Sequence, residues 1–416
     1  MTEQIRLPNG TRLAFEHIPY VRSAALGVLV GAGSRHETAR ENGASHFLEH
    51  MLFKGTETRS AARLAEEMDA IGGQINAYTS KETTCFHGRV LDTHLDKLSE
   101  ILADMLLNSR LDDGDVASER GVIYEEIDMY NDQPDDLVNE RLLTGVFKGN
   151  SLARPILGTK ASLSAMTGAS LREYMNGKYR AGATIIALAG SFKDGDIRRI
   201  SELFSALPEG GKNAYKPAKY VPTLTVKRRA LEQNHVCVAL PGIAANDPRR
   251  FAMQLFSDIL GGGMSSRLFQ KVREERGLCY GISTSGVTHL DTGIFTIYTA
   301  LGYESQTEAV GLIAGELKKM LDSGVTDAEL SRAREQVKAN VLMSLESTTS
   351  RSARLTKLLN FERLEEPDEI IAAYDAVTRE DVRAVAEYVL DAPQTSLSVV
   401  GKTDGAADLL ATLRGQ

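Results

Sequence analysis

The sequence predicts an α+β fold with two homologous domains, each a mainly antiparallel sheet covered by helices. Strand-like and helix-like segments come in runs and do not alternate strictly, which is typical of this class. The two halves of the 416-residue chain show a similar order of elements. A segment rich in turn-forming residues, 207–217, separates them. We therefore expect domains at residues 1–210 and 223–416, joined by a linker at 211–222.

Both halves can be read element by element. Residues 1–7 lack a secretory signal and are expected to enter a first strand directly. The later elements of the first half are a strand at 24–31, helices at 44–54 and 60–71, a hairpin at 74–92, two long helices, the second at 112–133, and a strand at 184–190. Those of the second half are a strand at 236–240, helices at 251–260 and 265–275, strands within 280–300, two helices within 305–345 and a strand at 395–401.

The most informative short motif is His-Phe-Leu-Glu-His at residues 46–50. On the predicted helix, His46 and His50 are four residues apart, so both imidazoles lie on one face and can hold one cation. Glu49 flanks the same face, which makes this the inverted zinc-peptidase motif H-x-x-E-H. A surface helix with two unrelated histidines is the alternative. However, the helix is apolar on nearly every side and therefore buried, and buried histidines and glutamates need partners.

A tetrahedral catalytic zinc uses three protein ligands and keeps one position open. The helix at 112–133 offers the third ligand, because Glu119 and Glu126 lie on its apolar face, where carboxylates are rarely buried unless paired or ligated. Glu125 lies about 100° further round and is expected to be solvated. An alternative is that the two glutamates pair with arginines such as Arg120. The apolar residues that define this face are Val116, Ile123, Ile127 and Tyr130.

These residues together resemble the pitrilysin/insulinase family of inverted-motif zinc peptidases, in the two-domain branch that includes mitochondrial processing peptidases and their bacterial relatives. The resemblance implies that His46, His50 and Glu126 bind one Zn²⁺ per chain and that Glu49 is the general base. It also implies that Glu119 is a second catalytic carboxylate beside the metal. Nearly the whole chain takes part, and further matching segments are residues 72–79, 154–159, 179–190 and 273–280.

The same resemblance implies how a substrate is held. A peptide would bind as an added strand along the start of the hairpin, at Asn76, Ala77 and Tyr78. Arg273 and Tyr280, seven residues apart, would donate hydrogen bonds to the scissile carbonyl as negative charge develops on it. The alternative is that Arg273 is an ordinary surface residue and Tyr280 packs in a strand.

The second half keeps the scaffold but lacks the metal ligands. Aligning the long helices puts Asn340 opposite Glu126, and aligning the strands puts Phe251, Gln254 and Leu255 opposite the motif. Single-chain family members with four such domains close around a chamber, whereas this chain has room for two. We therefore expect a homodimer in which Arg273 and Tyr280 of one subunit serve the zinc of the other.

Composition excludes several classes of protein. A net charge of −8 argues against a nucleic-acid partner, and no apolar run reaches the roughly 18 residues that a membrane span needs. Three widely spaced cysteines, Cys85, Cys237 and Cys279, suit reduced thiols in the cytoplasm better than a disulfide framework. The three glycines at 261–263 lack the Gly-Lys-Ser/Thr of a phosphate loop and are expected to form a turn.

The function predicted from the sequence is that of a zinc-dependent endopeptidase. Its expected substrates are short or unfolded peptides, including presequence-like ones, because strand addition reads extended backbone. The alternatives are a non-catalytic structural subunit, like the core proteins of a respiratory complex, and a zinc-stabilised binding module. Loss of a ligand or of the base would indicate a structural subunit, and all four residues are present.

Overall fold

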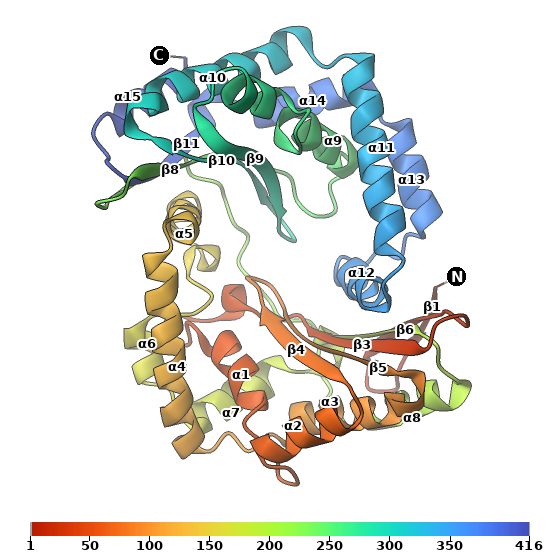
Figure 1. The fold of residues 1–416 in the computed structure, drawn as a ribbon. Helices are drawn as coiled ribbons and strands as arrows, with labels where there is room; N and C mark the ends of the chain where they lie inside the picture. Colours follow the sequence, from red (N-terminus) through yellow and green to blue (C-terminus); the bar gives the residue numbers. More distant parts are fainter. Residues whose placement is uncertain (1, 416) are drawn as a thin grey trace. The chain divides into compact units, whose positions relative to one another are not determined.

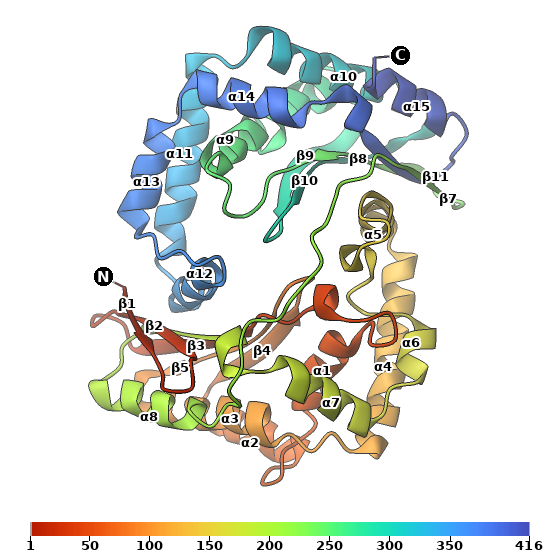
Figure 2. The ribbon, with the colours of Figure 1, turned by 180° about the vertical axis from the view of Figure 1, so that it is seen from behind.

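The computed structural model describes residues 2–415, which form two compact units that are described here one at a time. Each unit is a sheet of mainly antiparallel strands with helices on its faces, so the predicted α+β class is confirmed (Figures 1 and 2). Unit 1 comprises Met1–Ile127, Arg154–Lys216 and Leu342–Glu366, and unit 2 comprises Asp128–Ala153, Pro217–Val341 and Pro367–Gln416.

The sheet of unit 1 has six strands in the order β1-β2-β6-β3-β5-β4. Only the pair β2 and β6 is parallel, and all other neighbours are antiparallel. β4 is an edge strand that pairs with β5 alone, and its side chains alternate between exposed and half-buried. The strands are β1 (Glu3–Arg6), β2 (Arg12–His17), β3 (Ser23–Val30), β4 (Gln74–Thr79), β5 (Thr84–Leu91) and β6 (Thr184–Gly190).

Most helices of unit 1 pack on one face of this sheet around a large apolar core. The opposite face is covered by α12 (Thr348–Asn360), whose Leu355 and Leu359 pack with Leu29 and Ile185 of the strands. α12 lies close to the sheet at Gly27, where a Cβ atom would be 3.1 Å from Ser352 Oγ. The other helices are α1 (Ala44–Leu52), α2 (Ala61–Ala70), α3 (Leu95–Asn108), α4 (Asp113–Asp132), α6 (Lys160–Ser164), α7 (Gly168–Lys178) and α8 (Asp194–Phe204).

The buried face of α4 is shorter than the sequence pattern predicts. Val116, Glu119 and Ile123 are buried, and Ile127 is half-buried. Tyr130, predicted to continue the apolar face, is instead 44% exposed. The helix crosses from unit 1 to unit 2 after Ile127, so its last turn no longer packs on the core of unit 1.

The sheet of unit 2 has five strands in the order β7-β11-β8-β10-β9, with β7 and β11 parallel and the other neighbours antiparallel. The predicted helix at 265–275 is wound as a π-helix over Phe269–Glu274, with bonds such as Glu275 N–H to Gln270 O (2.9 Å). The strands are β7 (Leu224–Arg228), β8 (Gln233–Pro241), β9 (Cys279–Thr288), β10 (Gly293–Gly302) and β11 (Ser396–Gly401). The helices on the main core are α9 (Arg250–Gly261), α10 (Gln306–Ser323), α11 (Asp327–Ser344), α13 (Pro367–Ala376), α14 (Arg379–Val389) and α15 (Ala406–Leu413).

One helix of each unit comes from the opposite half of the sequence. α5 (Pro134–Val146) packs Val138 and Leu142 against Ala239 and Ile294 in unit 2. α12 comes from the second half of the sequence and packs against the sheet of unit 1. The contiguous domains expected at 1–210 and 223–416 therefore differ from the compact units: residues 128–153 belong to unit 2 and residues 342–366 to unit 1.

Two further sequence expectations can be compared with the structure. All three cysteines are buried and free of disulfide bonds. In the part of the chain that the structure describes, no helix is both long enough and apolar enough to span a lipid bilayer.

Candidate metal centre

Helix α1, which carries the H-x-x-E-H motif, is held at its N-terminus by a buried carboxylate. Glu37 accepts hydrogen bonds from the backbone N–H groups of Gly43 and Ser45, both 2.8 Å long, and from the amide of Asn42 (3.1 Å). These bonds satisfy donors that a helix start otherwise leaves unpaired. Gly43 has a φ of 97°, and a Cβ there would lie 2.9 Å from Leu157 O, so a larger residue does not fit. The N-terminus of α1, two residues before His46, is therefore held in one position.

The three predicted ligands come together between α1 and α4. Glu126 Oε2 lies 3.5 Å from His46 Nε2 and 3.7 Å from His50 Nε2. Zinc bonds of about 2.1 Å in tetrahedral geometry separate ligand atoms by about 3.4 Å, so this spacing fits one ion. Glu126 Oε2 is buried and accepts no hydrogen bond from the described residues. Within residues 2–415, no other group of three histidines, cysteines or carboxylates brings its ligand atoms this close together.

The protonation state of His46 also favours metal binding. Burial, together with the neighbouring His50, lowers the pKa of His46 to about 3, so its imidazole is neutral near pH 7. A neutral imidazole offers the lone pair that a metal needs. Burial raises the pKa of Glu126 above its usual value, and His50 partly offsets this effect. A cation at this place would compensate the cost of keeping that carboxylate charged.

A second carboxylate orients one of the two histidines. Glu119 Oε1 lies 2.8 Å from His50 Nδ1, which leaves Nε2 of that ring for the metal. Lys54 Nζ lies 2.5 Å from Glu119 Oε2. Burial raises the pKa of Glu119, but the hydrogen bonds from Lys54 and His50 outweigh burial and hold it below its usual range. The alternative pairing with Arg120 is wrong, because Arg120 donates to the carbonyls of Leu163 and Met166.

Glu49 does not belong to the three-ligand cluster. Its carboxylate is half-buried and accepts a hydrogen bond of 2.5 Å from Thr79 Oγ1 at the end of β4. Burial raises the pKa of Glu49, while Thr79 and His50 oppose that shift. The sequence pattern identified Glu49 but gave no indication of Thr79 or Lys54. His50 and Lys54 do lie at helical i, i+4 spacing, which is the one local signal that could have indicated Lys54.

The predicted substrate residues lie on the open edge of the sheet of unit 1. Asn76 and Tyr78 are exposed on β4, and Ala77 between them is half-buried. Ala77 N–H donates to Asn76 Oδ1 (2.8 Å), so one backbone donor of the edge is bonded locally. Their contact with a substrate stays a prediction.

Arg273 and Tyr280 belong to unit 2, at the π-helix and the start of β9. The Arg273 guanidinium lies 4.5 Å from the Phe269 ring centre and 5.3 Å from that of Tyr280. Tyr280 is 86% exposed, so the alternative in which it packs in the sheet is wrong. A role in substrate binding stays a prediction.

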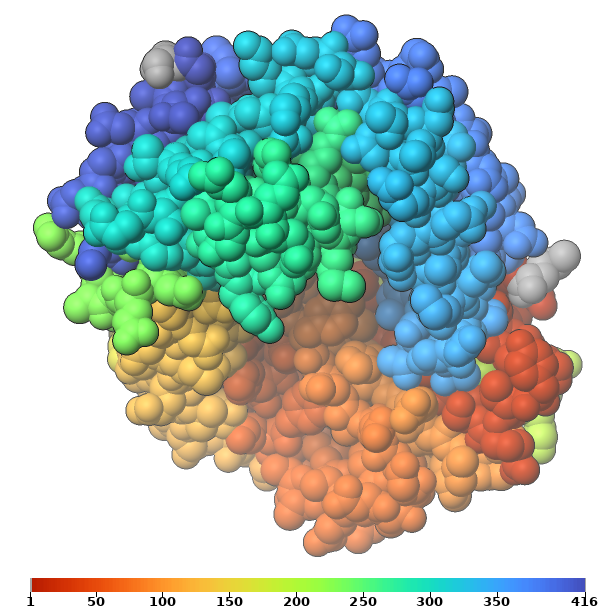
Figure 3. Space-filling view, turned by 45° about the horizontal axis from the view of Figure 1, so that its top comes forward, coloured from red at the N-terminus to blue at the C-terminus, as the bar shows by residue number. Residues whose placement is uncertain are grey.

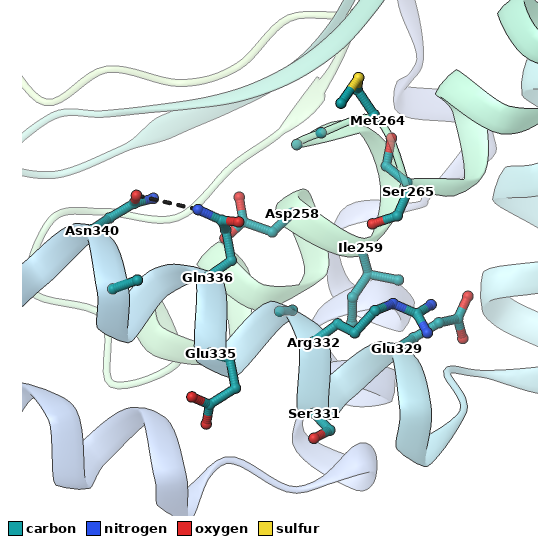
Figure 4. A pocket seen from close by; sticks show the side chains of 15 residues that line it. Asp258, Ile259, Met264, Ser265, Glu329, Ser331, Arg332, Glu335, Gln336 and Asn340 are labelled. Atoms are coloured by element: carbon teal, nitrogen blue, oxygen red, sulfur yellow. Dashed lines mark hydrogen bonds between the residues drawn. The ribbon is translucent and has the colours of Figure 1, made fainter.

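Unit 2 has its own groove between α9 and α11, the counterparts of α1 and α4. Buried Leu330, Ala333 and Val337 of α11 repeat the spacing of the buried residues of α4, which leaves Asn340 at the place of Glu126. In the groove, of ≈ 700 Å³, the Gln336 amide donates to Asn340 Oδ1 (Figure 4). In Figure 3 the light-blue surface of α11 borders the green surface that follows α9. No histidine is among the described residues that line this groove.

Comparison with known families decides the relationship. Residues 12–160 match the model "Insulinase (Peptidase family M16)", and residues 165–337 match "Peptidase M16 inactive domain". The chain belongs to peptidase family M16. The matched M16 inactive-domain region includes the residues that line the groove without histidines, except Ala339 and Asn340.

Similar M16 relatives cover nearly the whole chain. A Bacillus subtilis protein named uncharacterized zinc protease YmxG is 40% identical over 94% of this chain and 96% of its own length. An uncharacterized zinc protease of Streptomyces coelicolor is 38% identical over 95% of this chain and 88% of its own.

Solved structures share the M16 fold at lower identity. A Helicobacter pylori protease superposes with a TM-score of 0.89 at 20% identity, covering 96% of this chain and 99% of its own. A chain of complex III2 from Candida albicans gives a TM-score of 0.86 at 20% identity, covering 99% of both chains. These likenesses establish the fold alone.

Proposed function

We propose that this M16 chain is a zinc-dependent endopeptidase that binds one Zn²⁺ through His46, His50 and Glu126. The observation that carries the proposal is the convergence of the three ligand atoms within 4.8 Å of one another. Two of them, from His46 and His50, belong to α1, the helix that also carries Glu49, and the third, from Glu126, belongs to α4. The zinc protease names of the two relatives support it. A zinc ion held there supplies Lewis-acid chemistry, which polarises the scissile carbonyl and lowers the pKa of water.

The side chains divide the remaining work. Glu49 takes a proton from the attacking water and passes it to the leaving amine. The hydroxyl of that water becomes part of a new carboxyl end of the substrate peptide, and the leaving amine becomes its new amino end. Glu119 holds the ring of His50 in the orientation that leaves Nε2 free, and Lys54 holds the second oxygen of Glu119.

We propose that the substrate binds as an extended strand along β4. An edge strand offers unpaired backbone groups, so an added strand gains hydrogen bonds without needing particular side chains. The local bond between Ala77 N–H and Asn76 Oδ1 must give way when a peptide pairs there. A folded protein cannot supply a free strand, which limits substrates to short or unfolded segments, including presequence-like peptides.

Metal removal tests the proposed function. Incubated with a pool of unstructured peptides, the zinc-loaded protein is expected to cleave them, to lose this activity with a chelator, and to regain it with added Zn²⁺. Mass spectrometry of the products measures the cleavage, and a folded protein substrate serves as the control that stays intact. Hydrolysis that persists without metal would exclude the proposed chemistry. A zinc-loaded protein without any hydrolysis would favour the structural-subunit alternative, which shares this fold.

We further propose a homodimer in which Arg273 and Tyr280 of one subunit act at the zinc of the other. The high exposure of Tyr280 supports this, because an exposed phenol is available to a second surface. Inactive Glu49→Gln and Tyr280→Phe chains, once mixed, should regain about a quarter of native activity, since about half of the dimers are mixed and have one intact site of two. Subunit exchange, followed with two affinity tags, is the control. A fully active monomer, or no rescue despite exchange, would contradict the arrangement.

A further inference from the structure

Thr79 connects the proposed substrate strand to the proposed base. It is the last residue of β4, and its side chain lies on the same half-buried face of that strand as Ile75 and Ala77. Its Oγ1 lies 2.5 Å from Glu49 Oε2 on α1. Thr79 and Glu49 are 30 residues apart in sequence, so only the packing of α1 on β4 brings them together.

The hydroxyl hydrogen of Thr79 can be assigned to this bond. Thr84, directly opposite Thr79 in the pairing of β4 and β5, lies 3.4 Å away through its Oγ1. Thr84 is fully buried and donates its own hydroxyl hydrogen to Ala32 O (2.9 Å). Each hydroxyl has a single hydrogen to donate. A carboxylate has no hydrogen to donate, so the hydrogen of Thr79 points at Glu49 in the 2.5 Å contact, which is shorter than the 3.4 Å contact with Thr84.

Glu49 depends on this bond more than the neighbouring carboxylate depends on any one partner. Glu119 is held at both oxygens, by His50 and by Lys54. In the described part of the chain, the Thr79 hydroxyl is the one side-chain donor to Glu49. Fixing Oε2 also fixes the plane of the carboxylate and the direction of Oε1. A general base has to point at the proton it removes.

We propose that Thr79 is a positioning residue for Glu49. Its hydroxyl couples the binding of a peptide along β4 to the orientation of the Glu49 carboxylate. This inference rests on the proposed peptidase function. Thr79 is the last residue of β4, so a peptide that pairs along β4 also restricts the movement of the residue that orients Glu49. A merely structural role would instead be to satisfy a half-buried carboxylate.

Thr79→Val and Thr79→Ser separate these two roles. Valine keeps the shape but removes the hydroxyl, and kcat is expected to fall about 10- to 100-fold with KM and zinc content unchanged. Serine keeps the hydroxyl and should restore kcat to near the native value. Thr11→Val is the matched control, because Thr11 is a fully buried threonine of the same unit whose hydroxyl contacts no partner among the described residues. In a Glu49→Gln background, Thr79→Val should have no further effect.

Crystal structures of the metal-free native and Thr79→Val proteins give a readout that needs no activity. Glu49 is expected in one orientation in the native protein and in several, or in a different one, in the variant. If Thr79→Val does not fold, Thr79→Ala provides the same comparison. Native kcat in the valine variant, an unchanged Glu49, loss of zinc, or a serine variant as impaired as the valine one would each overturn the proposal. A native protein without peptidase activity would overturn the proposed function, while the orientation of Glu49 in the two structures still decides the role of Thr79.

Discussion

Replacing Glu49 with glutamine is expected to reduce peptide hydrolysis by roughly 10²–10⁴-fold while the protein stays folded and retains zinc. The amide has the shape of the carboxylate and can still accept the hydrogen bond from Thr79, but it cannot take a proton from water. Glu49 is not one of the three converging ligands, so metal binding should persist. The measurements are kcat/KM on an unstructured peptide, zinc content, and thermal unfolding.

Glu66→Gln is a suitable control for this variant. Glu66 is an exposed glutamate on the neighbouring helix α2, and its replacement should leave both activity and zinc content unchanged. A Glu49→Gln protein that cleaves peptides at the native rate would show that another group transfers the proton.

Replacing Glu126 with glutamine is expected to remove the metal itself. A neutral amide is a poor zinc ligand, and the two remaining histidines cannot complete the site alone. The loss of zinc affinity should exceed the roughly 10–100-fold that is typical when a partner behind a ligand is removed. Zinc content after dialysis and competition with a metal indicator measure this change.

Glu125 provides the matched control, since it precedes Glu126 on the same helix and is exposed. Glu125→Gln should retain zinc fully. Full occupancy in the Glu126→Gln protein, combined with loss of zinc from a Glu125→Gln or Glu119→Gln protein, would mean that the ligand has been assigned to the wrong residue.

The parts of the site that the sequence predicts are those governed by helical periodicity. His46 and His50 share a face because a helix returns to it after four residues, and Glu126 shares a face with Val116 and Ile123 for the same reason. The prediction failed at Tyr130, where the local pattern continues but the packing partner changes. Periodicity shows which side of a helix is buried, but not where that burial ends.

The contacts that the sequence did not predict depend on tertiary packing. The bond between Thr79 and Glu49 joins a strand to a helix, and no pattern within either element specifies the other. The same limit applies to α5 and α12. Neither helix is among the elements predicted from the sequence, and an apolar helical face fits either of two similar sheets. Only the complete fold shows that each covers the sheet of the other half.

This exchange of α5 and α12 has a consequence for dissecting the protein. A fragment ending in the linker near residue 216 keeps the strands of unit 1 but loses α12, which exposes the apolar surface around Leu29 and Ile185. The complementary fragment loses α5 and exposes the surface around Ala239 and Ile294. Uncovered patches of this kind favour aggregation. Although the sequence contains two tandem copies of one fold, we therefore expect neither half to fold stably without the helix that the other half supplies.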